Sequence, residues 1–404
     1  MDFGKVALAG GFLKKEGVST EVRYPLSVCF CEDCYAVQVP QKVDPGILFG
    51  NYFYYSSAIA TLREHFADYA TEVIARFIDK PQQATVVEFG CNDGILLRPL
   101  ADQQIKNVIG VDPATNIVNV IQDPRINIIN EFFTREIAGQ IVQKYGHADL
   151  VVANNVYAHI PDINGVTEAV ANVLASNGVF VFEVHYLGKI IQDLQYDMIY
   201  HEHLYYYSLL ALENHLARHG MRVFDVKPIA IHGGSMRYYA CKEGSDHASR
   251  VSARVNLLRE EELAHGYDQL KTYEKFAAEC ARRRDELMNL LNRLKRKGKT
   301  VAGYGASGRA NTIIQYCGIG REHLDYMIDD APAKAGYLTP GSHLLIRGGE
   351  ALRENPPDYL LIFAWTYFNE IAKKCDDWAA KGGRLVVPLP DVRVTFSPVS
   401  DDLL

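Results

Sequence analysis

Residues 86–97, VVEFGCNDGILL, constrain the fold of this chain more than any other stretch. An apolar run leads into an acidic residue, then into two glycines four positions apart, Gly90 and Gly94, and a second apolar run follows. This order predicts a buried strand, a tight turn and the start of a helix, which is a nucleotide-binding turn of an α/β domain. The turn completes neither the dinucleotide fingerprint nor the phosphate loop with its Lys and Ser or Thr.

The motif that remains, E-x-G-x-N-x-G, resembles the first motif of class I S-adenosylmethionine (SAM) methyltransferases. Residues 107–112 predict a second strand that ends in Asp112, where such folds place an acid on the ribose hydroxyls. Residues 148–156 predict a third strand with amides at its carboxyl end, where ligands bind in open α/β sheets. We therefore expect SAM as cofactor, although one such turn alone also fits an ordinary α/β domain. The predicted cofactor ligands are Glu88, Gly90, Asn92, Asp93, Gly94, Asp112, Asn154 and Asn155.

Length and charge bound the other possibilities. A chain of 404 residues predicts two or three domains, and its net charge of -7 gives no basic footprint for nucleic acid. The sequence contains neither an apolar run of membrane-spanning length nor a secretory signal at its start, so we expect a cytoplasmic protein without a membrane partner. The eight cysteines are mostly scattered singly, which indicates reduced thiols.

Near the start, Cys31 and Cys34 have the C-x-x-C spacing of one half of a zinc ribbon. A structural zinc needs four ligands, and the sequence has no second C-x-x-C. Two free thiols in a β-hairpin explain the pair at least as well, so zinc is doubtful.

An aromatic cluster at residues 48–57, LFGNYFYYSS, has two interpretations. Tyr52, Tyr54 and Ser56 either belong to packing or form a sugar-facing wall, since a tyrosine offers a flat apolar face and a polar tip. Residues 59–77 follow with apolar side chains at helical spacing and predict a helix.

The densest set of reactive side chains is residues 200–208, YHEHLYYYS. If the segment is extended, His201 and His203 point to one side and could bind a metal with His185 or Glu183. Alternatively one histidine is a general base, tuned by Glu202 or a tyrosine, and tyrosine hydroxyls donate to a developing oxyanion. A polar loop that only closes a domain is the structural alternative.

The second half of the chain predicts another α/β unit. Residues 232–239 indicate a glycine turn that leads into a strand, and Ser235 and Arg237 there either serve the turn or hold a phosphate or ketone. Long helices are expected over residues 249–297. Residues 300–312 then predict a strand, a glycine turn and a helix N-terminus, with Ser307 and Arg309 placed to receive an anion, which favours a nucleotide diphosphate.

Together these motifs resemble the sugar C-methyltransferase family over essentially the whole chain. Members of that family methylate carbon 3 of nucleotide-linked 4-keto deoxysugars. The resemblance implies an α/β fold in three parts: a zinc-ribbon-like segment at residues 1–45, a class I SAM methyltransferase Rossmann-like core at 46–245, and a helical linker with a C-terminal Rossmann-like domain at 246–404. It also implies a substrate linked to thymidine diphosphate, a nucleotide-diphosphate sugar, and leaves the oligomeric state open.

The same resemblance assigns roles to individual residues. The base falls on His203, the neighbouring glutamate on Glu202, and the tyrosines on Tyr200 and Tyr54. Predicted substrate contacts are Tyr52, Ser56, His159, His201, Ser235, Arg237, Tyr304, Ser307, Arg309 and Asn311.

Two departures from the family pattern stand out. The family's first C-x-x-C precedes a segment like residues 1–5, MDFGK, so half of the zinc site is missing from this sequence. Relatives often carry Pro-Ala-Lys where this chain has Ser307-Gly308-Arg309, which predicts a bidentate guanidinium on the diphosphate. Rival functions are a metal-dependent sugar-nucleotide hydrolase or epimerase and a non-catalytic nucleotide-sugar binding protein.

Overall fold

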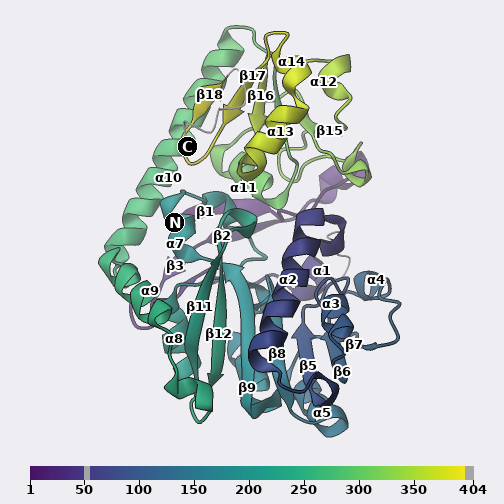
Figure 1. The fold of residues 1–404 in the computed structure, drawn as a ribbon. Coiled ribbons are helices and arrows are strands. Elements are labelled where there is room, and N and C mark those ends of the chain that lie inside the picture. Colours follow the sequence, from purple (N-terminus) through teal and green to yellow (C-terminus); the bar gives the residue numbers. More distant parts are fainter. Residues whose placement is uncertain (50–54, 396–404) are drawn as a thin grey trace.

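The computed structural model describes residues 1–49 and 55–395 (Figure 1). Its lower half is built on a seven-stranded sheet of order β11-β12-β9-β8-β5-β6-β7. The strands β5 to β9 pair in parallel, whereas β11 and β12 run antiparallel at one edge. The bounds are β5 Thr85–Phe89, β6 Asn107–Val111, β7 Ile126–Ile129, β8 Ala148–Asn154, β9 Leu174–His185, β11 Met221–Ile229 and β12 Ser235–Lys242.

Helices cover both faces of this sheet. The helices α2 (Ala60–Phe77) and α3 (Leu97–Asp102) pack on one face, and α5 (Arg135–Tyr145) and α6 (Ile163–Val173) pack on the other. Successive residues of β5 therefore enter opposite cores: Val86 faces α2, and Val87 faces α5. Burial on both faces explains why the strands are nearly continuous apolar runs, and the predicted α/β class is confirmed.

The upper half of Figure 1 is a second α/β unit. Its six-stranded sheet has the order β15-β14-β13-β16-β17-β18 and is parallel except for β18. The bounds are β13 Val301–Tyr304, β14 Met327–Ile328, β15 Ile346–Arg347, β16 Tyr359–Ile362, β17 Arg384–Val387 and β18 Arg393–Thr395. The predicted long helices are α9 (Ala253–Ala264) and α10 (Leu270–Arg296), and α10 runs along the side of this unit (Figure 1).

The N-terminal segment contacts both halves. β1 (Asp2–Ala7) forms a hairpin with β2 (Arg23–Ser27), while β4 (Val37–Gln38) pairs with both β3 (Cys29–Phe30) and β10 (Tyr205–Tyr206). The side chain of Gln315, on α11 (Gly308–Cys317), exchanges two hydrogen bonds with the backbone of Ala7. The remaining helices are α1 Pro45–Phe49, α4 Thr115–Val118, α7 Leu187–Gln192, α8 Leu209–Ala217, α12 Ala351–Glu354, α13 Phe368–Lys374 and α14 Asp376–Ala379.

None of the helices described for residues 1–49 and 55–395 combines the length and the apolar character needed to cross a bilayer.

A buried ion pair joins β9, β12 and α2. Arg237 on β12 lies directly across the strand pair from Glu183 and donates from Nε at 2.7 Å and Nη2 at 2.6 Å. It also donates to Glu72, and its guanidinium lies 3.6 Å from the ring centroid of Tyr69. The side chains of Arg237 and Glu183 are 2% and 0% exposed. These contacts correct the prediction that Arg237 holds substrate, because its donors are committed to carboxylates inside the fold.

Arg237→Leu should therefore destabilise the protein strongly. Removing one partner of a buried ion pair leaves an uncompensated charge, and we expect the free energy of unfolding to fall by about 3–5 kcal/mol. Arg254→Ala is the matched control, because the side chain of Arg254 is 53% exposed in its pair with Asp225 and should cost less than about 1 kcal/mol. Urea unfolding followed by circular dichroism measures both. Equal losses in the two variants would contradict this assignment.

Candidate active site

The predicted glycine turn lies at the carboxyl end of β5. Gly90, Asn92 and Gly94 have left-handed φ angles of 66°, 49° and 78°. A Cβ on Gly90 would lie 2.5 Å from Cγ2 of Val156, so the loop after β8 packs against a position that only glycine can fill. The backbone N–H of Asn92 donates to Asp112 at 2.9 Å, which fixes the turn to the end of β6.

Unsatisfied acceptors gather at this edge of the sheet. Four buried side-chain oxygens accept no hydrogen bond from the described residues: Oε2 of Glu88 and Oδ1 of Asp93, Asn154 and Asn155. All four belong to predicted cofactor ligands, and buried polar atoms of this kind are normally paired. A molecule that brings ammonium, hydroxyl and amino donors, as SAM does, fits them. Burial raises the pKa of Asp112, and its two carboxylate oxygens accept from the backbone of Asn92 and Ala114.

Ser56 and Ser57 lie on the glycine turn. The N–H of Ser56 donates to Oδ1 of Asn92 at 3.0 Å, and the N–H of Ser57 donates to Oδ2 of Asp93 at 3.1 Å. The short segment Ser56–Ala58 is therefore fixed to the cofactor loop. Ser56 is thus beside predicted cofactor ligands, whereas the sequence suggested a substrate contact. Tyr52 and Tyr54 lie outside the described residues.

His203 is held in one tautomer. Its Nδ1 donates to the carbonyl oxygen of Met198 at 2.7 Å, so Nε2 carries the free lone pair. Its ring centroid lies 4.0 Å from that of Tyr200 and 5.0 Å from that of His159. Burial lowers the pKa of His203 well below its ordinary value, and His159 lowers it further. The neutral imidazole is therefore the resting form at pH 7.

The neighbouring Glu202 differs from an ordinary surface carboxylate. Burial raises the pKa of Glu202 to about 7. Its Oε1 lies 3.4 Å from the position of a Cβ on Gly10, so this carboxyl group is next to the N-terminal segment.

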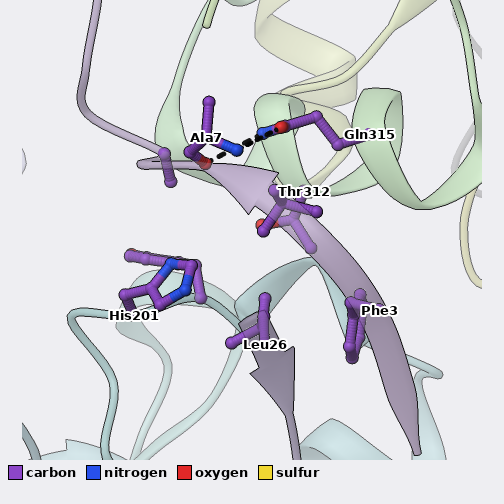
Figure 2. A pocket seen from close by; sticks show the side chains of 9 residues that line it. Phe3, Ala7, Leu26, His201, Thr312 and Gln315 are labelled. Carbon is purple, nitrogen blue, oxygen red and sulfur yellow. Dashed lines mark hydrogen bonds between the residues drawn. The ribbon is translucent and has the colours of Figure 1, made fainter. Parts of the chain in front are cut away.

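His201 does not share the surroundings of His203. The chain turns here, with the N–H of His203 donating to the carbonyl of Tyr200, instead of running extended. Nε2 of His201 donates to the carbonyl of Pro25 at 3.1 Å. Figure 2 shows the His201 ring beside Leu26 at a small cavity that Phe3 and Thr312 also line. These contacts join His201 to the N-terminal hairpin, and the extended geometry assumed for a shared metal site is wrong.

The described residues also do not fit a zinc ion. Cys31 and Cys34 are free thiols, and no group of three or more His, Cys, Asp or Glu residues within 1–49 and 55–395 could hold a metal. Because a structural zinc needs four ligands, we assign no role to a metal here.

The C-terminal unit contributes Arg309 from the first turn of α11. Its Nε donates to Asp197 at 2.8 Å, and the indole N–H of Trp365 donates to the same oxygen at 2.9 Å. Nη1 of Arg309 also contacts the carbonyl of His232 at 3.4 Å, so this guanidinium bridges the two α/β units close to the glycine turn before β12.

Other predicted substrate residues have contacts within the protein. Ser307 caps α11 through the N–H of Ala310, and Asn311 donates to the carbonyl of Ala9 at 2.6 Å. Tyr304 donates to Asp330 at 2.6 Å and packs within the C-terminal core. The remaining one, Ser235, is buried, and its hydroxyl donates to the carbonyl of Ile231 at 3.3 Å.

The fold places two further histidines near His203, and the sequence predicted no catalytic role for either of them. The ring of His185, at the end of β9, lies 5.2 Å from that of His203. The ring centroid of His232, in the turn before β12, lies 5.8 Å from that of His185. Sequence reasoning considered His185 only as a metal ligand and His232 only as part of the His-Gly-Gly-Ser turn, because only the fold brings these rings together.

Comparisons with known proteins match this arrangement. Family models described as "Methyltransferase domain", "C-methyltransferase C-terminal domain" and "Putative zinc binding domain" match residues 62–226, 230–390 and 1–49. C-methyltransferase NovU from Streptomyces niveus is 35% identical over 395 residues, which cover 98% of this chain and 93% of NovU. The chain belongs to the C-methyltransferase family. The resemblance to sugar C-methyltransferases noted in the sequence is thereby confirmed at the family level.

Solved structures similar to part of this C-methyltransferase include two SAM-dependent enzymes. One is a methyltransferase from Clostridium acetobutylicum, with 16% identity and a TM-score of 0.34 over 45% of this chain and 92% of that chain. The other is magnesium protoporphyrin IX methyltransferase from Synechocystis with bound SAM, with 14% identity and a TM-score of 0.34 over 45% of this chain and 79% of that chain.

The family assignment identifies the protein as a SAM-dependent C-methyltransferase. The free oxygens at the carboxyl edge of the sheet are compatible with this cofactor.

Gly90→Ala should weaken cofactor binding. The new methyl group meets Val156 and strains a left-handed backbone by about 1–2 kcal/mol, so we expect the Kd for S-adenosylhomocysteine to rise at least about tenfold. Isothermal titration measures the change. Gly139→Ala on α5 is the control, because a Cβ there meets nothing within 4 Å. Unchanged affinity in a folded Gly90→Ala sample would contradict the placement of the cofactor.

Proposed function

We propose that this enzyme methylates carbon 3 of a nucleotide-diphosphate 4-keto deoxysugar, linked to thymidine diphosphate, in deoxysugar biosynthesis. The observation that carries the proposal is the hydrogen bond from Nδ1 of His203 to Met198, which leaves Nε2 as a preformed base. A ketone acidifies the hydrogens on the adjacent carbons, so a positioned neutral imidazole can remove one of them. The similarity to NovU over nearly the whole chain supports C-methylation.

The proposed chemistry begins with Nε2 of His203 removing the hydrogen from carbon 3. The electron pair of the broken C–H bond moves toward the ketone, and the negative charge develops on its oxygen. Tyr200, whose ring lies against His203, and Glu202, with its pKa raised to about 7, are the proposed donors to this oxygen. Bound SAM supplies an electrophilic methyl group. Most of the rate then comes from positioning the carbon for an in-line reaction.

We propose that the nucleotide diphosphate lies between the two α/β units. Arg309 pairs with the buried carboxylate of Asp197 and reaches from the C-terminal unit to the carbonyl of His232, and it lies in the first turn of α11. A guanidinium and a helix N-terminus both favour phosphate. His159, which stacks on His203, is the proposed sugar contact. We also propose that the domains of the chain divide at residues 45 and 245, and that the enzyme is cytoplasmic.

His203→Asn tests the assignment of the base. Asparagine keeps a polar side chain but cannot accept the proton, so kcat should fall at least about a hundredfold, a typical contribution of a general base. Both ligands should still bind in isothermal titration. His265→Asn, at an exposed histidine beyond the end of α9, is the matched control and should keep full turnover. A fully active His203→Asn enzyme would refute the proposed mechanism.

A further inference from the structure

The proposed reaction produces one proton per turnover, and the enzyme must release it. A carbon–hydrogen bond breaks and a carbon–methyl bond forms, so each turnover yields methylated ketone, S-adenosylhomocysteine and one proton, which Nε2 of His203 holds. The product carbon no longer has a vacant position for it. This proton must reach solvent before the next substrate can be deprotonated, and the inference below rests on the proposed function for that reason.

His203 cannot release the proton through its other nitrogen. Nδ1 already donates to the carbonyl of Met198, and a carbonyl does not carry protons onward. The side chain is also buried, at 5% exposure. The proton therefore has to leave from Nε2 toward a neighbouring group.

Three histidines lie near His203 and could receive this proton. His159 stacks on His203 with an angle of 20° between the ring planes, which presents a ring face. The ring centroids of His185 and His203 lie 5.2 Å apart, with an angle of 39° between the ring planes. The ring centroids of His232 and His185 lie 5.8 Å apart, with an angle of 55° between the planes. Both His185 and His232 are half-buried, so the series runs from a buried base to partly exposed rings. These separations join ring centroids, and a water molecule can bridge polar atoms of neighbouring rings.

The backbone holds His232 in an unusual conformation. Its φ of 56° and ψ of 22° are left-handed, and Gly233 and Gly234 also have positive φ angles. Arg309 donates to the carbonyl of His232, and Gln195 donates to that of Gly233 at 2.7 Å. A strained residue held by its surroundings is a common feature of functional sites, and the ring of this residue lies next to that of His185.

Both rings are suited to carry a proton without retaining it. Burial lowers the pKa of His232 to about 4. The nearby carboxylate of Glu183 acts in the opposite direction but does not offset the effect of burial. Burial and the neighbouring histidines also lower the pKa of His185 well below its ordinary value. A neutral ring with one free lone pair accepts a proton only transiently.

We propose that His185 and His232 form a proton exit path that takes the proton from Nε2 of His203 to solvent after each methyl transfer. The two residues are relay groups, and neither is the base.

The test separates the first turnover from later ones. His232→Asn is the variant of choice, because asparagine tolerates the left-handed backbone. In weakly buffered solution with SAM and a thymidine-diphosphate 4-keto deoxysugar, we expect the first methyl per active site to form at the wild-type rate. Later turnovers should slow at least about fivefold relative to wild type, and added imidazole should restore them. His265→Asn is the matched control and should behave as wild type.

Two results would overturn the relay. Steady-state turnover equal to that of wild type in both His232→Asn and His185→Asn would show that the rings carry no proton. Equal slowing of the first and later turnovers, without rescue by imidazole, would show a structural or substrate-binding role. Failure of the proposed function is distinguishable, because the wild-type enzyme itself would then transfer no methyl group to the sugar.

Discussion

One hydrogen bond determines the chemistry of this site: Nδ1 of His203 donates to the carbonyl of Met198. It sets the tautomer, orients the ring against Tyr200 and leaves a single nitrogen to act. Burial keeps that nitrogen unprotonated by lowering the pKa of the imidazole. If His203 is the base, as proposed, the proton that it removes needs a route to solvent, and we propose this role for His185 and His232.

Two other parts of the molecule support the segment around His203, residues 196–203. The N-terminal hairpin contacts it through the carbonyl of Pro25, which accepts from His201. The C-terminal unit contacts this segment through Arg309, which donates to Asp197, the residue before Met198. The glycine turn after β5 fixes the cofactor edge of the sheet. Residues far apart in the sequence thus converge around His203.

Local patterns predicted the fold well. The apolar runs, the glycines and Asp112 identify the strands and the cofactor turn, because these features depend on neighbours in the sequence. The directions of side chains after position 199 could not be predicted, since a turn there separates His201 from His203. Arg237 resembled a phosphate ligand until the fold showed Glu183 across the strand pair. No catalytic role was predicted for His185 and His232, because only tertiary structure brings them together.

The most direct test of the account is hydrogen exchange at the sugar in heavy water. The enzyme is incubated with S-adenosylhomocysteine and a thymidine-diphosphate 4-keto deoxysugar, so that deprotonation is possible but methylation is not. Proton NMR follows each ring position. The account predicts loss of the carbon 3 signal with the wild-type enzyme and its retention with His203→Asn. Exchange only at carbon 5, or equal exchange with both enzymes, would contradict it.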